Sequence, residues 1–165
     1  MEDKKLVKLS VYIALASLLQ MSEMVIPTFF PGVKVGFANI VTLIVLYTFS
    51  LKEALLVAGM RTIVTSLLIG SFLTPTFVLS FSAAIVSTLV MGILLLNKFI
   101  AKKISIISVS IFGALSHNLT QFALAYLLIV RHANFYWYLP IILISSLATG
   151  ILTGIIARYL LRKIK

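Results

Sequence analysis

The sequence predicts an all-α membrane protein, a single bundle of six transmembrane helices with both chain ends in the cytoplasm. Hydrophobic residues make up 61% of the 165 residues and charged residues 11%, whereas soluble domains are about 45–50% apolar and about 25% charged. The mean hydropathy is +1.17. The charged residues also lie mainly at the ends of long apolar runs. This composition excludes an ordinary cytosolic globule and a disordered chain.

The first three apolar runs predict helices over residues 6–26, 35–50 and 53–69. A transmembrane helix needs about 20 mostly apolar residues, so the second helix is short and is expected to lie partly below the membrane surface. Pro27 and Pro31 mark the break after the first helix, and the sequence Ser-Leu-Lys-Glu at 50–53 predicts a tight turn before the third.

The remaining runs predict helices over residues 75–96, 104–130 and 137–161. Thr74-Pro75 predicts a helix start, since proline favours the first helical position, and Pro140 marks a similar start for the last helix. No stretch is polar and long enough to form a soluble domain. Residues 1–165 are therefore expected to form one integral membrane domain.

The basic residues predict the orientation of this bundle. With the N-terminus inside, 11 of the 14 Lys and Arg residues fall in cytoplasmic segments, and only Lys34 and Arg131 fall in outer ones. Cytoplasmic segments normally carry this excess, so both termini are expected inside a multi-pass protein of the cell (inner, or cytoplasmic) membrane. The orientation of the helices in the membrane explains the net charge of +10. We therefore expect the lipid bilayer to surround the protein, and we do not expect nucleic acid as a partner. The outer side collects the aromatic residues Phe29, Phe30, Phe72, Phe77, Phe135, Tyr136, Trp137 and Tyr138.

Polar residues within the predicted helices are the candidate ligand contacts. Polar groups are costly in lipid and tend to face a bundle interior or a cavity. The candidates are Asn39, Arg61, His117, Asn118 and Gln121, followed by Glu23. The three on the fifth helix fall within an arc of roughly 100°, so they can converge on one point. Arg61 offers a planar, permanently charged fork for a carboxylate or phosphate.

These candidates define a polar funnel that opens outward. We expect the outer loop Pro27–Lys34 and the loop Arg131–Tyr138 to line its mouth, and a loop of this kind can act as a lid. The N-terminus of the second helix is expected to point into the same region, where it would favour anions. A purely structural alternative is that Glu23 and Arg61 neutralise each other and that His117 and Asn118 form an interhelical hydrogen-bond pair.

Small residues at helical spacing predict close helix packing. Gly150 and Gly154 form a GxxxG pattern, continued by Ser146, and such residues let helices approach closely in lipid. This pattern supports a compact bundle and does not point to a function.

The motifs of the common catalytic classes are missing from the sequence. It contains no GxxxxGK[ST] motif for nucleotides and no HExxH zinc motif. It has no cysteine, and Asp3 is its only aspartate. We therefore expect a chain that is not an enzyme, with no cofactor and no metal.

Two elements resemble one membrane family. They are the run Pro-Gly-Val-Lys-Val-Gly-Phe-Ala-Asn-Ile at 31–40, and the element His117-Asn118-x-x-Gln121, with Lys-Glu-Ala at 52–54 and Arg61 between them. The sequence is similar in this way to the Gx transporters, also labelled heptaprenyl diphosphate synthase component I. That family in turn is similar to the substrate-binding (S) components of energy-coupling factor (ECF) transporters.

The resemblance implies six helices and a ligand held on the outer side. It also implies partners, namely a transmembrane coupling subunit and cytoplasmic ATPases. The coupling surface of S components includes small residues on the first helix, for which the nearest match is Ser10-x-x-x-Ala14.

The function that we expect is uptake of a small, anionic or polar molecule from outside, with vitamin or cofactor precursors as the class. Flavin-like, quinone-precursor and isoprenoid compounds all stay open as ligands. One alternative is a non-catalytic membrane subunit for polyprenyl (heptaprenyl) diphosphate synthesis. Another is an ion- or proton-coupled carrier that works alone, with Glu23 or His117 as the proton site.

Overall fold

The computed structural model describes residues 2–25 and 36–164 of the chain, and these residues are helical apart from short connections. The helices are α1 (Glu2–Val25), α2 (Phe37–Thr48), α3 (Leu51–Ile69), α4 (Pro75–Leu96), α5 (Lys98–Lys103), α6 (Ile106–Ala125) and α7 (Leu139–Ile164). A π-helical turn at Tyr126–Val130 extends α6, and a 3-10 turn at Ala133–Tyr138 precedes α7.

The start of α4 lies where the sequence predicts it. The Thr74 side chain accepts a hydrogen bond from the backbone N–H of Phe77, and Pro75 occupies the first turn, where its missing N–H has no helical partner to lose. The last helix begins at Leu139, two residues later than predicted, because the aromatic segment before it forms the 3-10 turn.

The short helix α5 was not predicted. The backbone of Asn97 is extended and ends α4, while its side chain accepts hydrogen bonds from the N–H groups of Phe99 and Ile100. One residue therefore stops one helix and caps the next. The six residues of α5 are too few and too polar to give an apolar run, so hydropathy does not reveal them.

Four segments are long and apolar enough to cross a membrane: Asp3–Glu23, Pro75–Leu96, Ile106–Val130 and Phe135–Ile164. The 12 residues of α2 span only about 18 Å at 1.5 Å per residue, against a hydrocarbon core of about 30 Å. The helix α3 has 19 residues but carries Lys52, Glu53 and Arg61. The all-helical membrane class is thus supported, while the count of six spans stays a prediction.

The helix α2 forms the centre of the bundle. The helices α1, α3, α4, α6 and α7 pack consecutively on one another, and α2 contacts α1, α3, α4 and α7. Its buried side chains are Ala38 and the seven consecutive residues 40–46. A helix that is apolar on all sides belongs inside a protein, which explains why the shortest predicted span is the core element.

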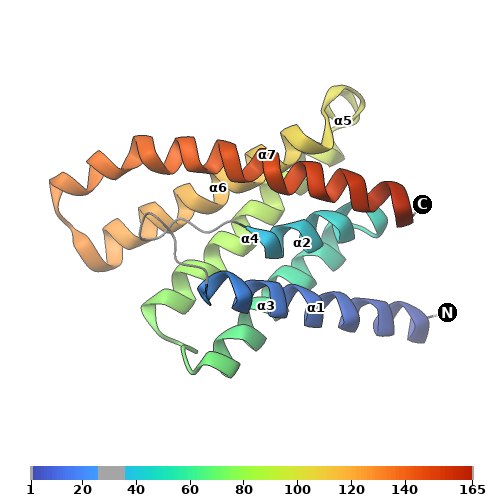
Figure 1. Ribbon diagram of the computed structural model, residues 1–165, viewed down its shortest axis with the longest axis horizontal. Helices are drawn as coiled ribbons and strands as arrows, with labels where there is room; N and C mark the ends of the chain where they lie inside the picture. The colour runs from blue at the N-terminus through green and yellow to red at the C-terminus, as the bar shows by residue number, and fades with distance from the viewer. Residues whose placement is uncertain (1, 26–35, 165) are drawn as a thin grey trace.

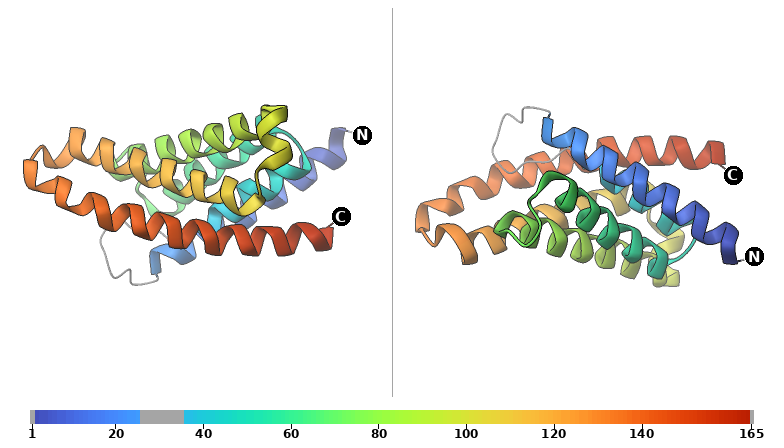
Figure 2. Two further views of the ribbon diagram at one scale, coloured as in Figure 1. Left: turned by 90° about the horizontal axis from the view of Figure 1, so that it is seen from above. Right: turned by 90° about the horizontal axis from the view of Figure 1, so that it is seen from below.

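The contact between α6 and α7 confirms the predicted close packing at the GxxxG pattern (Figure 2). A Cβ atom added to Gly150 would lie 2.7 Å from Ile111 Cα, and one added to Gly154 would lie 2.8 Å from Ile107 Cα. Glycine is required at both positions because backbone, not a flexible side chain, fills that space.

The two ends of the bundle differ in chemistry. Both termini and α5 lie at one end, and the α3–α4 and α6–α7 connections lie at the other (Figure 1). Exposed aromatic side chains gather at the second end, namely Phe72, Tyr136, Trp137 and Tyr138, while Phe99 on α5 and Tyr159 on α7 are exposed toward the first end. The first end carries basic residues of the N-terminal segment, α5 and the last turn of α7.

Candidate functional site

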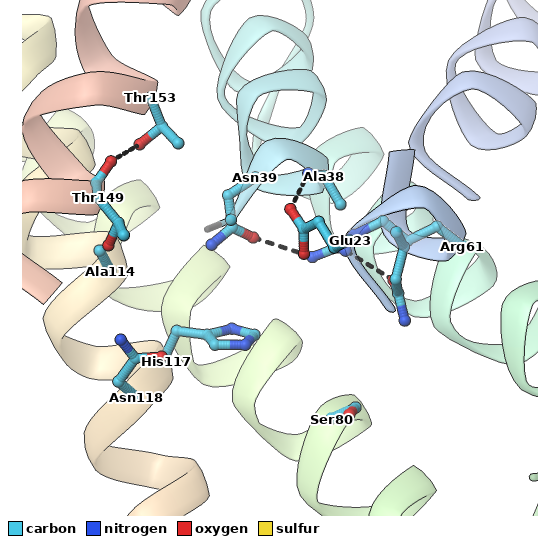
Figure 3. Close-up of a pocket in the computed structure, with 12 residues that line it drawn as sticks. Glu23, Ala38, Asn39, Arg61, Ser80, Ala114, His117, Asn118, Thr149 and Thr153 are labelled. Carbon is cyan, nitrogen blue, oxygen red and sulfur yellow. Dashed lines mark hydrogen bonds between the residues drawn. The ribbon is translucent and has the colours of Figure 1, made fainter. Parts of the chain in front are cut away.

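A polar pocket lies where six helices meet (Figure 3). Its lining residues come from α1, α2, α3, α4, α6 and α7 and the residue before α2: Gln20, Glu23, Gly36, Ala38, Asn39, Arg61, Ser80, Ala114, His117, Asn118, Thr149 and Thr153. The cavity volume that is open to the centres of water molecules is about 30 Å³. Since one water needs about 10–15 Å³ on this measure, the pocket accommodates about two or three waters or a small polar group.

Arg61 is the buried cation of this pocket, with 4% of its surface exposed. Its Nη1 donates a hydrogen bond of 2.8 Å to Gln20 Oε1, and its Nη2 donates one of 2.9 Å to Asn39 Oδ1. Among the described residues, Nε has no hydrogen-bond acceptor. The guanidinium is thus positioned by two neutral amides from α1 and α2, and Nε is the one of its three nitrogens that has no acceptor in the described part of the chain.

Small and hydroxyl-bearing residues on α3 explain how this arginine is placed. Ala54, Ala58, Thr62 and Thr65 share its buried face and let α1 approach closely. The Thr65 hydroxyl donates to the backbone carbonyl of Ser17 at 3.4 Å. The contact between α1 and α3 therefore places the Arg61 side chain next to Gln20.

Glu23 stabilises the start of α2. The residue before this helix, Gly36, has a φ of 83° and no side-chain cap. The Glu23 carboxylate accepts a hydrogen bond of 3.3 Å from the backbone N–H of Ala38, so it supplies from α1 the acceptor that a helix N-terminus needs. The prediction that this helix end attracts a ligand anion needs correction, because a carboxylate of the protein already lies there.

His117 and Asn118 come to the pocket from α6. Asn118 is buried and its Nδ2 donates a hydrogen bond of 2.8 Å to Ser146 Oγ on α7. This bond ties α6 to α7 and matches the structural alternative for Asn118. The ring of His117 points toward the middle of the pocket (Figure 3).

Five of the six predicted ligand contacts thus line one pocket: Glu23, Asn39, Arg61, His117 and Asn118. Gln121 does not line it. It follows His117 by four residues, which moves it about 6 Å along the helix axis, toward the end of α6. The predicted outer loop Pro27–Lys34 lies outside the described residues.

A family model described as heptaprenyl diphosphate synthase component I matches residues 12–160. The chain belongs to this family. No curated protein and no solved structure matches the chain significantly. The matched region contains every residue that lines the pocket, from Gln20 to Thr153.

Ser10 and Ala14 lie outside the pocket, on the exposed face of α1. Val7, Val11 and Leu18 are also 61–64% exposed on this helix. The Ser10 hydroxyl donates to the backbone carbonyl of Leu6 within the same helix, so it leaves the surface largely apolar. The predicted coupling role of Ser10 and Ala14 stays a prediction.

Sequence reasoning did not include Gln20, Thr149 and Thr153 among the site residues. Gln20 lies three residues before Glu23 and so shares its helix face, which is a usable signal. The two threonines lie among the small residues of α7. That pattern indicates helix packing, so the sequence does not show that they line a pocket. Within the described part of the chain, no three His, Asp or Glu side chains are grouped as metal ligands would be.

Proposed function

We propose that this protein is the substrate-binding component of a membrane uptake system for a small anionic molecule. The observation that carries the proposal is the burial of Arg61 in a polar pocket to which six helices contribute. A buried arginine is costly within a membrane, and such residues normally line a substrate path or pair with a specific group. Arg61 lines this pocket, and its buried Nε has no acceptor among the described residues, which supports a role beyond packing.

The arrangement of the helices supports an outward-facing pocket. In the proposed topology α2 and α3 also cross the membrane, the basic end of the bundle lies in the cytoplasm, and the aromatic end lies at the outer surface. The residue Asn39 in the first turn of α2 contacts Arg61, and that turn faces the aromatic end (Figure 1). A ligand would therefore enter from outside.

In this proposal, the energy for uptake comes from partner proteins and not from this chain. A transmembrane coupling subunit and cytoplasmic ATPases would supply it, and the exposed face of α1 around Ser10 and Ala14 would contact the coupling subunit. The apolar character of that face supports a contact within the membrane.

The test is mass spectrometry of small molecules that co-purify with the protein in mild detergent. The wild type should carry an anionic compound that Arg61→Ala lacks. Arg158→Ala is the matched control, because it removes an exposed arginine near the end of α7 that lies outside the pocket and should retain the compound. Retention by both variants would remove Arg61 from the site and, with it, the proposal.

A second candidate is a non-catalytic membrane subunit for polyprenyl diphosphate synthesis, which the family description favours. Such a subunit needs a cytoplasmic docking surface, and the basic end with Lys102 and Lys103 on α5 would offer one. Co-purification with a soluble prenyl synthase, but not with ATPases, would support it. Co-purification with ATPases alone would favour uptake.

A further inference from the structure

The short helix α5 is a separately built element at the basic end of the bundle. The Asn97 side chain caps its start by accepting hydrogen bonds from the N–H groups of Phe99 and Ile100. Its last turn closes with a bond of 2.8 Å from the N–H of Ile104 to the carbonyl of Ile100, and the Ser105 side chain then caps α6. Caps on both sides therefore give this connection a defined shape.

Phe99 is the most prominent side chain of α5. With 87% of its surface exposed, it is the most exposed of the large hydrophobic side chains in the described part of the chain. The helix contacts α4 and projects from the side of the bundle at the end where both termini lie (Figure 1). A capped turn thus holds a large apolar side chain away from the core, where burial within this chain cannot stabilise it.

Two lysines share the exposed face of α5 with Phe99. Lys102 and Lys103 follow it by three and four residues, so they lie on either side of it on the helix surface. Both are exposed, whereas Ala101, on the opposite side of the turn, is half-buried. This face therefore combines one apolar ring with two cations.

The preceding helix indicates what meets this face. The helix α4 is long and apolar enough to span a membrane, and its exposed side chains Leu89, Ile93 and Leu96 would contact acyl chains. Phe99 follows Leu96 by only three residues, so α5 begins where the chain leaves the hydrocarbon. At that depth an aromatic ring reaches the acyl boundary, and the long lysine side chains extend to the headgroups.

We propose that α5 is an interfacial anchor for anionic lipid. The Phe99 ring enters the acyl boundary, while Lys102 and Lys103 bind the phosphates of anionic headgroups. The cytoplasmic leaflet carries the negative surface potential that such cations complement. The inference goes beyond the proposed function, because it depends neither on a ligand in the pocket nor on transport, and it assigns this face to lipid and not to a soluble synthase.

The test uses the full chain in lipid nanodiscs with one indole on α5. Trp137 is the only tryptophan, so Trp137→Phe combined with Phe99→Trp gives a single fluorescent site, and both positions are exposed. The nanodiscs contain phosphatidylcholine alone, or equal parts of phosphatidylcholine and phosphatidylglycerol. Lipid brominated near the top of the acyl chain should quench the indole more strongly when phosphatidylglycerol is present. Acrylamide, an uncharged quencher in the water phase, should quench it less.

Two double variants in this background separate the anchor from the overall charge. Lys102→Gln with Lys103→Gln should weaken attachment to the anionic surface by roughly 30-fold, and the effect of phosphatidylglycerol on both quenchers should be lost. Lys4→Gln with Lys8→Gln is the matched control, because it removes the same charge from exposed positions on α1 at the same end and should retain the effect. High salt should reduce the effect in the parent protein.

Three results would overturn the inference. The first is quenching by acrylamide but not by brominated lipid in the anionic nanodiscs, which would place the ring in water. The second is equal quenching with and without phosphatidylglycerol, or loss of its effect in the α1 control. The third is co-purification of a soluble prenyl synthase that Phe99→Ala abolishes, which would assign this face to a protein partner.

Discussion

The carboxylate of Glu23 accepts a hydrogen bond from the backbone N–H of Ala38, across the contact between α1 and α2. Two features that the sequence presents separately, an acidic residue near the end of one helix and an uncapped start of the next, are therefore one interaction. It explains how a helix that begins after Gly36, with no cap of its own, can start inside a bundle. The same carboxylate lines the pocket that holds Arg61, so one acidic side chain serves both the start of α2 and the charge balance of the pocket.

The capping role of Glu23 predicts an effect on stability. Glu23→Ala should lower the free energy of unfolding by about 1 kcal/mol, the usual cost of a lost helix cap, because the Ala38 amide loses its acceptor. Glu23→Gln keeps an oxygen acceptor and should lose less. Thermal unfolding in detergent measures both, with the exposed neighbour Ser22→Ala as the control. Equal stability of Glu23→Ala and wild type would rule out the cap.

The backbone contact at Gly150 predicts a second effect. Gly150→Ala adds a methyl group 2.7 Å from Ile111 Cα and should cost about 1–3 kcal/mol, since α6 and α7 must separate. Gly59→Ala is the matched control, because its Cβ would meet only side-chain atoms at 3.6 Å or more, and alanine favours a helix. Chemical unfolding should show that Gly150→Ala is less stable than the wild type and that Gly59→Ala is more stable.

The bond from Asn118 to Ser146 predicts an energetic coupling between α6 and α7. Asn118→Ala and Ser146→Ala should each destabilise the protein, and the double variant should lose less than the sum of the two. The coupling should be about 0.6 kcal/mol, as is typical of hydrogen bonds between membrane helices. A double-mutant cycle measures it, and strict additivity would show that the bond contributes nothing.

The proposed orientation predicts the accessibility of single cysteines. The chain has no native cysteine, so Ser71→Cys at the α3–α4 connection and Lys103→Cys at the end of α5 each provide a unique thiol. A membrane-impermeant maleimide added to intact cells should label Ser71→Cys only, and both variants should react after the cells are opened. The reverse pattern would place the basic end outside.

The sequence predicts the helices where apolar runs are long and the caps are local. The range 75–96 agrees with α4 because proline and threonine mark its start and Asn97 its end. The sequence also identifies five of the residues that line the pocket, since polar groups in apolar helices face inward. The sequence misses α5, whose six residues carry no hydropathy signal. Gln121 does not line the pocket, and its contact with a ligand stays a prediction. The role of Glu23 depends on a contact between two helices, which no local pattern contains.

The shortness of α2 gives the interior of the bundle two different parts. Its first turn holds Asn39 beside Arg61, whereas its later residues are tightly packed, with Leu43 and Val45 at most 1% exposed. At about 18 Å, the helix is about 12 Å shorter than a typical hydrocarbon core. The polar pocket therefore ends at an apolar layer, and in the proposed uptake role a bound molecule would reach the side of the chain termini only if the packing around α2 rearranged.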